Sequence, residues 1–342
     1  MRQGLFGRSL ALYAGCHLLV DWACILLVTG PLRQGVSTHR DWLAVILLYN
    51  ACAFAMQLPL GVLLDWRGTS RWAAGAGAGL VAAGWLLLPV PVLACVTAGL
   101  GNALFHLGGG REVLLRSEAR AAPSGLFVST GAVGVWLGVW CARIGRSGLL
   151  PPLCLLALAS AALLLRSRNA AVGERFWPPA RRSGGLLVSV ALLTLTVVLR
   201  SWVGGQMDFP WKVGGLSLLA VLCAAGGKAL GGVFGDRLGW SRFGTLTLLL
   251  SAVCFLPSFR LVPAGLAANL LFNGTMAVTL AALAKRLGSE NSGAAFGLTT
   301  FALFLGTLPN PSWGASPGVL CGGALLSALL LWGGLRKGAE PP

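Results

Sequence analysis

Apolar residues along this chain fall into twelve long runs, separated by short segments that hold most of the charged residues. A helix needs about 20 mostly apolar residues to cross the hydrocarbon core of a bilayer. The runs lie at 9–30, 42–64, 72–89, 92–110, 122–142, 148–165, 185–206, 213–235, 243–258, 261–283, 293–309 and 317–335. Between the third and fourth runs no charge occurs, and the prolines of LPVPV (88–92) supply the break. The pattern predicts an all-α polytopic membrane protein with twelve transmembrane helices.

The positive charges predict how these helices are oriented. If the N-terminus is cytoplasmic, the inner segments hold 18 of the 26 lysines and arginines, and the outer segments hold six. This bias indicates that both termini are cytoplasmic. The longest polar stretch, at 166–184, is basic and contains a Pro-Pro pair. We interpret it as a cytoplasmic central loop between an N-terminal six-helix bundle (1–165) and a C-terminal six-helix bundle (185–342).

The composition excludes several classes of protein. Charged residues make up 11% of the chain and the mean hydropathy is +0.78, whereas soluble domains carry about 25% charged residues. The net charge of +16 is spread in small clusters, so it does not predict a nucleic-acid partner. The nine cysteines lie in apolar runs without the spacing of a metal site or a disulfide framework, and neither is expected. The first run resembles a signal peptide, but Asp21 interrupts it, and we expect a retained helix.

One short phrase occurs twice, as GVLLDWRGTSR (61–71) and GGVFGDRLGWSR (231–242). Its two aspartates, Asp65 and Asp236, are 171 residues apart, which is half the length of the chain. Each copy lies between the second and third apolar run of its half. Glycines at such places allow helices to approach closely and turns to be tight. An aspartate at a helix end can hydrogen-bond free backbone N–H groups or face the positive N-terminus of another helix. The chain is therefore expected to consist of two similar halves.

This phrase resembles the G-x-x-x-D-R-x-G-x-R/K signature of the major facilitator superfamily, and the predicted two-bundle architecture is similar across the whole chain. The resemblance implies a conformational latch, in which the turn holds neighbouring bundles together in the outward-facing state. The residues that the resemblance places in this latch are Gly61, Asp65, Arg71, Gly232, Asp236, Arg237 and Arg242. Trp66 stands where the family usually has a basic residue. The alternative is that these residues only form turns and anchor the topology.

Two further stretches, GLGNALFHLGGGRE (99–112) and HLLVDW (17–22), resemble the bacterial fosmidomycin-resistance type of drug exporter. Those exporters carry a similar Phe-His in the fourth helix and a polar residue with an aspartate in the first. Here no proline follows Phe105-His106, and STGAVGVWLG (129–138) lacks the Gly-Pro of the antiporter motif. The resemblance implies efflux of a small molecule across the bacterial cytoplasmic (inner) membrane.

Ionisable residues within the apolar runs are candidates for function, because burying them in a bilayer is costly. Asp21 lies near the middle of the first run, and His17 lies one helical turn before it. A carboxyl and an imidazole so placed predict proton coupling, with a purely structural pair as the alternative. Arg200 is interpreted as a counter-ion for Asp21, as an anchor for an anionic substrate, or as a side chain that extends to the membrane surface. Neutral polar candidates for the substrate cavity, together with one histidine, are Asn50, Gln57, Asn102, His106, Asn269 and Asn273.

These patterns favour a secondary active transporter that moves a small molecule by alternating access, with a proton-coupled exporter as the leading interpretation. A uniporter or symporter of a small metabolite is the alternative, and Arg200 would suit an anionic one. A membrane-embedded lipid-handling enzyme is a third possibility, but HExxH, GxSxG and Walker A sequences are absent. We therefore expect no enzymatic activity, no cofactor and no metal. The expected partners are the substrate, protons and the lipid bilayer, and the chain is expected to be a monomer.

Overall fold

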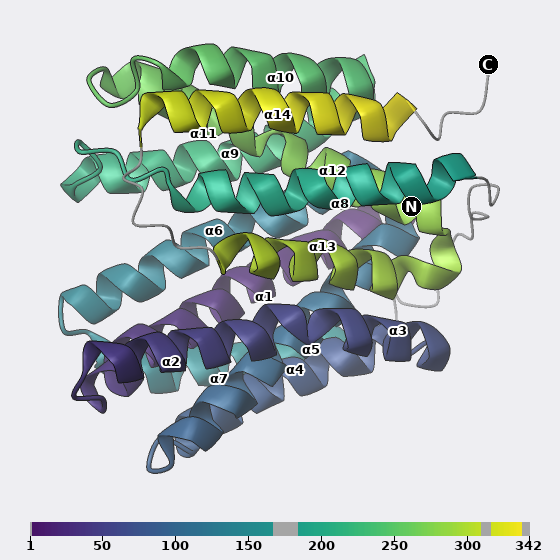
Figure 1. Cartoon of the computed structure of the whole chain (residues 1–342). Helices are drawn as coiled ribbons and strands as arrows, with labels where there is room; N and C mark the ends of the chain where they lie inside the picture. Colours follow the sequence, from purple (N-terminus) through teal and green to yellow (C-terminus); the bar gives the residue numbers. More distant parts are fainter. Residues whose placement is uncertain (1, 167–183, 309–315, 337–342) are drawn as a thin grey trace. The chain divides into compact units, whose positions relative to one another are not determined.

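The structure is a computed structural model that describes residues 2–166, 184–308 and 316–336. In these residues the regular secondary structure is helical, and no strand occurs among them (Figure 1). The α-helices are α1 (Arg2–Leu27), α2 (His39–Asn50), α3 (Gln57–Arg67), α4 (Ser70–Leu86), α5 (Pro91–Ser117), α6 (Ala121–Arg143), α7 (Leu150–Arg166), α8 (Gly184–Gly205), α9 (Gly214–Leu238), α10 (Trp240–Phe255), α11 (Val262–Asn273), α12 (Thr275–Leu287), α13 (Ser292–Thr307) and α14 (Pro317–Arg336). Short π or 3-10 segments are η1 (Val28–Leu32), η2 (Ala51–Ala55), η3 (Ser147–Leu149) and η5 (Ser289–Asn291). The all-α prediction is confirmed for this part of the chain.

Eight helical segments among the described residues are long and apolar enough to cross a membrane. They are Gly7–Leu32, His39–Arg67, Pro91–Ser117, Ala121–Arg143, Gly185–Gly205, Gly214–Leu238, Val262–Leu287 and Pro317–Arg336. Two shorter apolar helices, Ser147–Ser160 and Trp240–Phe255, accompany them. These segments indicate a multi-pass membrane protein. The count of twelve crossings and the orientation of the termini stay predictions, and the predicted central loop lies almost entirely outside the described residues.

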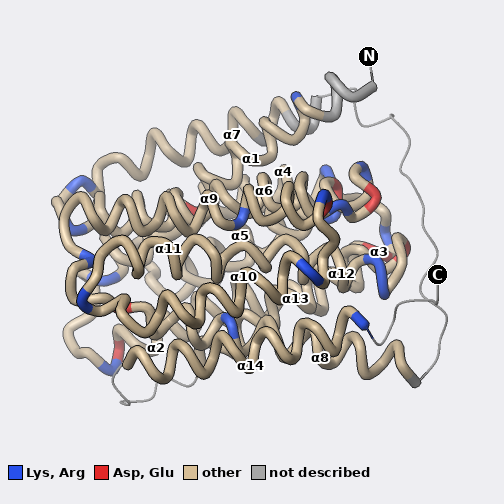
Figure 2. Tube along the Cα trace, turned by 90° about the horizontal axis from the view of Figure 1, so that it is seen from above, with Lys and Arg blue, Asp and Glu red and all other residues tan. Residues whose placement is uncertain are grey.

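The distribution of charge along the helices agrees with a membrane environment. Lysine, arginine, aspartate and glutamate gather near the helix ends, and the middles of the helices are nearly free of them (Figure 2). Large apolar side chains remain exposed on the helix surfaces, for example Val253 on α10 and Leu329 on α14, each about two-thirds exposed. Such surfaces are unfavourable in water but suit contact with lipid chains. The exposed apolar residues therefore mark helix faces that lipid covers.

The chain divides into two compact units. The N-terminal unit comprises Met1–Arg116, Thr130–Glu174 and Ser292–Thr300. The C-terminal unit comprises Ser117–Ser129, Arg175–Asn291 and Phe301–Pro342. Helices α6 and α13 each contribute residues to both units. The predicted boundaries of the bundles, at 165 and 185, stay predictions.

Each unit is a set of helices that pack against several neighbours. In the N-terminal unit α7 packs against α1 and α4. In the C-terminal unit α14 lies beside α10 and α8, while α11 packs against α9 and α10 (Figure 1). Because helices in a bilayer gain little from hiding apolar surface, close contact through small residues supplies much of their attraction.

Helices α4 and α5 show this close contact most clearly. A Cβ added at Gly77 would lie 2.6 Å from the backbone oxygen of Gly101, and one added at Gly101 would lie 2.7 Å from the backbone oxygen of Gly77. Only glycine fits at either position without moving a backbone. Gly77 and Gly101 thus set the distance between α4 and α5 in the N-terminal unit.

We expect Gly77→Ala to lower the midpoint of thermal unfolding, because the new methyl group would push α5 away at a cost of roughly 1–3 kcal/mol. Gly79→Ala is the matched control, since it lies on the same helix and an added Cβ there meets no atom within 4 Å. The control should leave the midpoint unchanged or raise it, because alanine favours helices by about 1 kcal/mol over glycine. The measurement is thermal unfolding of the purified chain in detergent. Equal shifts for both variants would contradict the packing argument.

Candidate functional site

A buried polar cluster lies in the N-terminal unit, and we call it the His–Asp cluster. Helix α1 supplies His17 and Asp21, and α5 supplies Asn102 and His106. Within each pair the residues are four apart, so both side chains of a pair lie on one face of their helix. All four side chains are buried, with exposed fractions between 2% and 9%. The structure thus brings the two predicted coupling residues together with two residues that the sequence placed in a substrate cavity.

The Asp21 carboxylate lies between two imidazoles. Its Oδ2 is 3.2 Å from Nε2 of His17, and its Oδ1 is 3.5 Å from Nε2 of His106. The side-chain amide of Asn102 donates a hydrogen bond of 3.0 Å to Oδ1. The two imidazole rings meet edge to face, with centroids 4.3 Å apart. One carboxylate therefore has three potential hydrogen-bond donors around it, depending on where the protons reside.

The position of one proton follows from the geometry. Nδ1 of His106 lies 2.9 Å from the backbone oxygen of Asn102. A carbonyl oxygen only accepts, so Nδ1 carries the hydrogen. In a neutral imidazole Nε2 is then an acceptor, and it faces Oδ1 of Asp21, which is also an acceptor when the carboxylate is ionised. The contact is favourable only when an additional proton is present on one of the two groups.

The same donor set has the spacing of a metal site. The nearest ligand atoms of His17, Asp21 and His106 lie within 4.8 Å of one another. Imidazole nitrogens and a carboxylate oxygen are ligands that Zn²⁺ accepts. The sequence did not predict such a group, because its members come from two helices more than eighty residues apart. A divalent cation and a proton are thus alternative occupants in chemical terms, and a chelator separates them by experiment.

Helix α6 closes one side of the His–Asp cluster. A Cβ added at Gly131 would lie 2.5 Å from Oδ2 of Asp21 and would also collide with His17. One turn further, an added Cβ at Gly134 would collide with the backbone of Leu18. The glycine spacing of STGAVGVWLG therefore has a physical reason, because it lets α6 lie directly against the ionisable pair of α1.

The first copy of the repeated phrase caps a helix. Asp65, near the end of α3, accepts hydrogen bonds from the backbone N–H groups of Gly293 (2.8 Å) and Ala294 (2.7 Å) at the start of α13. Arg111 of α5 donates to Asp65 through Nε at 2.9 Å and to Ser70 through Nη1 at 2.6 Å. The Asp65 side chain is thus held by the positive end of a helix and by a buried arginine. The sequence reasoning did not single out Arg111, although it is the first charge after the apolar run 92–110.

The second copy does the same in the C-terminal unit. Asp236, near the end of α9, accepts hydrogen bonds from the backbone N–H groups of Ala121 (3.0 Å) and Ala122 (2.9 Å) at the start of α6. In place of an arginine, the indole of Trp240 donates to it at 2.9 Å. A Cβ added at Gly232 would collide with the backbone of Ala121, so the glycine makes the approach possible. Both aspartates therefore cap the first turn of another helix.

The remaining latch candidates differ in their surroundings. Gly61 lies against the backbone of Gly293, as Gly232 lies against Ala121. Arg71 is half-buried on α4. Arg237 and Arg242 are exposed, and within the described ranges no hydrogen bond or ion pair is resolved for them. Trp66, where the family signature has a basic residue, is 88% exposed and leaves the cap of α13 intact.

Two of the other cavity candidates, Asn50 and Gln57, lie apart from the His–Asp cluster in sequence and in bonding. Gln57 is fully buried, and its side-chain amide donates to the backbone oxygen of Ala53 at 2.6 Å. Asn50 is half-buried at the end of α2, where the backbone changes to the π segment η2. The other amide atom of Gln57, Oε1, is buried without a hydrogen-bond partner among the described residues.

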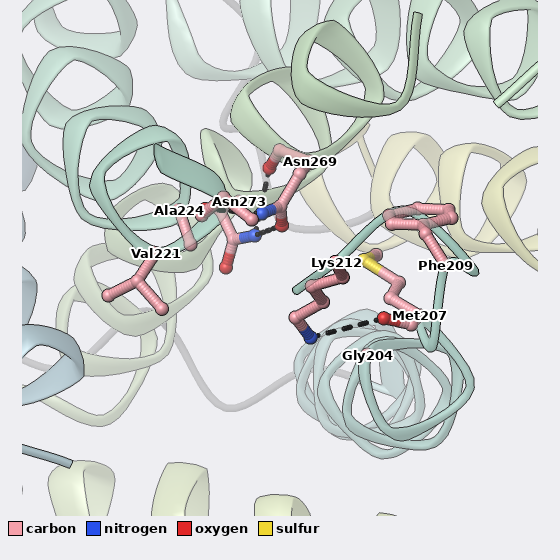
Figure 3. Close-up of a pocket in the computed structure, with 9 residues that line it drawn as sticks. Gly204, Met207, Phe209, Lys212, Val221, Ala224, Asn269 and Asn273 are labelled. Atoms are coloured by element: carbon pink, nitrogen blue, oxygen red, sulfur yellow. Dashed lines mark hydrogen bonds between the residues drawn. The ribbon is translucent and has the colours of Figure 1, made fainter. Parts of the chain in front are cut away.

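The last two candidates, Asn269 and Asn273, line a pocket of about 200 Å³ in the C-terminal unit, which we call the C-terminal pocket (Figure 3). Its lining residues are Gly204, Met207, Phe209, Lys212, Ala220, Val221, Ala224, Asn269 and Asn273. Asn269 donates to the backbone oxygen of Ala220 at 2.6 Å, and Asn273 donates to the Asn269 side chain at 2.9 Å. Burial lowers the pKa of Lys212, and the negative charge of Asp208 offsets part of this effect. The sequence did not single out Lys212, because it lies in a connection between helices.

Comparison with known proteins identifies the fold. No protein-family model and no curated protein matches the sequence. Among solved structures, the chain is similar to the fucose:proton symporter FucP of E. coli, at 12% identity over 97% of this chain and 98% of that one, with a TM-score of 0.69. It is also similar to the human organic anion transporter MFSD10 (16% identity, 95% of this chain and 99% of that chain, TM-score 0.70). A third similar structure is that of the proton:xylose symporter XylE, at 12% identity over 97% of this chain and 96% of that one, with a TM-score of 0.64.

All three of these proteins are major facilitator superfamily transporters. At these identities the likeness establishes the fold, and the chain has the fold of a major facilitator superfamily transporter.

The caps give a testable difference between the two units. We expect Asp65→Asn to destabilise the chain more than Asp236→Asn, because it leaves the buried Arg111 without its charge partner. Breaking a buried ion pair costs roughly 3–5 kcal/mol, whereas losing an exposed helix cap costs about 0.5–2 kcal/mol.

The measurement is the thermal unfolding midpoint of each variant in detergent. The double variant Asp65→Asn/Arg111→Gln should recover part of the loss, since it removes the unpaired charge. Equal midpoints for the two single variants, or no recovery in the double variant, would show that Arg111 does not depend on Asp65.

Proposed function

We propose that this chain is a proton-coupled secondary active transporter that exports a small molecule by alternating access. The observation that carries the proposal is the His–Asp cluster, in which a buried carboxylate faces two imidazole nitrogens inside a fold of the major facilitator type. Two of the similar structures are described as proton symporters, which supports proton coupling on this fold.

The cluster supplies the chemistry that coupling needs. An ionised carboxylate is expensive inside a membrane unless donors surround it. Asn102 donates permanently to Asp21, whereas the His106 contact is favourable only when an additional proton is present. Loading or losing one proton therefore changes the contact between α1 and α5. A local change of protonation is in this way converted into a change in helix packing.

The two caps supply the conformational part of the mechanism. Each one joins an aspartate at the end of one helix to the first turn of another, through two backbone N–H groups. Such bonds can break as a set when the helices separate and form again without rearrangement of side chains elsewhere. We infer that Asp65 and Asp236 stabilise one state of the transport cycle, in line with the latch that the family resemblance implies.

Export, and a place in the bacterial inner membrane, rest on the resemblance to the fosmidomycin-resistance type of exporter. The alternative is a uniporter or symporter of a small anionic metabolite. It is favoured by Arg200, which is buried in the C-terminal unit without a resolved bond to a carboxylate among the described residues. One similar structure is described as an organic anion transporter.

Proton coupling predicts a result that needs no knowledge of the substrate. In proteoliposomes on a solid-supported membrane, a pH jump should produce a transient charge displacement as protons enter the cluster. We expect Asp21→Asn to abolish this displacement, because the amide takes up no proton itself and no longer supplies the negative charge that would hold one on a neighbouring imidazole, while thermal unfolding shows that the variant is folded. Asp208→Asn is the control, since it removes an exposed carboxylate outside the apolar runs and should leave the signal unchanged.

The experiment is repeated with EDTA present. A displacement that persists in EDTA belongs to protons, whereas one that EDTA abolishes belongs to a bound divalent cation and contradicts the proposal. A wild-type displacement in Asp21→Asn would remove this residue from the coupling mechanism.

A further inference from the structure

Arg200 is a buried positive charge in the C-terminal unit with incomplete compensation. It lies on α8 and is 7% exposed. Nη2 donates to the backbone oxygen of Phe272 at 3.1 Å, and the guanidinium lies over the Phe272 ring, 5.3 Å from its centroid. Nε is buried and has no hydrogen-bond partner. Across the described parts of the chain, no resolved contact joins Arg200 to a carboxylate. An unpaired buried charge costs several kcal/mol, so the position calls for a ligand.

The Phe272 carbonyl lies at an interruption between two helices. Helix α11 ends at Asn273 and α12 begins at Thr275, with Gly274 between them. The last carbonyls of a helix lack partners within the helix. The Phe272 oxygen accepts from Arg200 and also from the hydroxyl of Thr275 at 3.3 Å. A shared neutral carbonyl compensates Arg200 only in part and leaves it with positive charge for an anion.

The C-terminal pocket is lined by close neighbours of this arginine. Gly204 of its lining lies one helical turn after Arg200 on α8, and Asn273 directly follows Phe272, to which Arg200 is bonded. Arg200 itself is not a lining residue. Lys212 lines the pocket, donates to the backbone oxygen of Met207 at 3.2 Å and retains two further N–H groups. Figure 3 shows Lys212 and Asn273 on facing sides of the space. One cation thus lines the pocket, and a second lies one helical turn from its wall within the same unit.

The side-chain amides of Asn269 and Asn273 indicate a second chemical group that the ligand bears. Asn273 directs two hydrogen bonds from Nδ2 to Asn269, one to its side chain and one to its backbone oxygen, both at 2.9 Å. Its amide hydrogens are used in this way, and its side-chain oxygen remains as an acceptor. The volume of about 200 Å³ is below the range of drug-sized pockets, which begins near 300 Å³. The lining suits a compact anion that also bears a hydroxyl group.

We propose that the C-terminal pocket binds a small hydroxylated organic anion. Lys212 attracts the acid group, and Arg200, one helical turn from Gly204, is the buried cation that holds it. This inference rests on the proposed transport function, because it names the class of substrate. The planar guanidinium suits a carboxylate or a phosphate equally, and both present the same anionic oxygens.

Binding is measured by calorimetry and thermal shift on the purified full chain, with L-lactate and L-malate as probes. Lactamide is the uncharged counterpart of lactate, and inorganic phosphate distinguishes the two kinds of acid group. We expect at least one hydroxy acid to bind and raise the unfolding midpoint, and lactamide to have no effect. Binding of phosphate alone would assign the site to phosphorylated substrates and would overturn the carboxylate as its ligand.

The variants locate the site. We expect Lys212→Gln to weaken binding about tenfold and Arg200→Gln about 100-fold, because truncating a buried charge contact costs more than truncating a half-buried one. Arg260→Gln is the matched control, since it removes an exposed arginine of the same unit outside this pocket and should leave binding unchanged. If Arg200→Gln does not fold, Lys212→Gln and Asn273→Ala test the pocket instead, each with an expected loss.

Equal binding of lactamide, loss of binding in Arg260→Gln, or full binding in Lys212→Gln and Arg200→Gln would each overturn the inference. So would the absence of binding by every probe. The pH-jump displacement separates this failure from that of the proposed function. A chain that binds none of the anions but still takes up protons at Asp21 keeps the coupling mechanism and loses only the pocket.

Discussion

A carboxylate held between helices needs hydrogen-bond donors, and this constraint explains the three most informative aspartates of the chain, of which Asp236 remains exposed. Asp21 has an amide and two imidazoles around it, Asp65 has two backbone N–H groups and an arginine, and Asp236 has two backbone N–H groups and an indole. Backbone donors at a helix start carry no proton that can be lost at ordinary pH, whereas imidazoles can gain or lose one. The same constraint thus yields caps built on backbone donors at two places and a cluster with ionisable donors at the third.

Arg200 shows the opposite situation, because its surroundings satisfy it only in part. A shared backbone carbonyl and an aromatic ring compensate a cation incompletely. If the chain needed only stability here, a neutral side chain would serve as well, since replacing buried charge by apolar groups is often neutral or stabilising. The aspartates have donors around their carboxylates, whereas Arg200 keeps a buried N–H group without an acceptor among the described residues.

Features of the site that depend on residues close together in the sequence could be predicted, whereas those that depend on packing between distant helices could not. The pairing of His17 with Asp21 follows from helical periodicity, and the two caps follow from a phrase that repeats at half the chain length. The contribution of Asn102 and His106 could not be predicted, because it depends on how α5 packs against α1. Arg111 was missed for the same reason. The run 261–283 looked continuous, and the interruption at Gly274, beside which the carbonyl that Arg200 uses lies, leaves no signal except a glycine among many.

Helix α6 contributes to both kinds of site, each within its own unit. Its first residues, Ala121 and Ala122, are capped by Asp236 within the C-terminal unit. Gly131, further along the same helix, lies against His17 and Asp21 within the N-terminal unit. Because a side chain at Gly131 would collide with both residues, nothing separates the backbone of α6 from the ionisable pair. A rearrangement of the pair therefore requires a change in how α6 packs against α1 within the N-terminal unit, so the glycine makes this helix contact sensitive to the hydrogen bonding of Asp21.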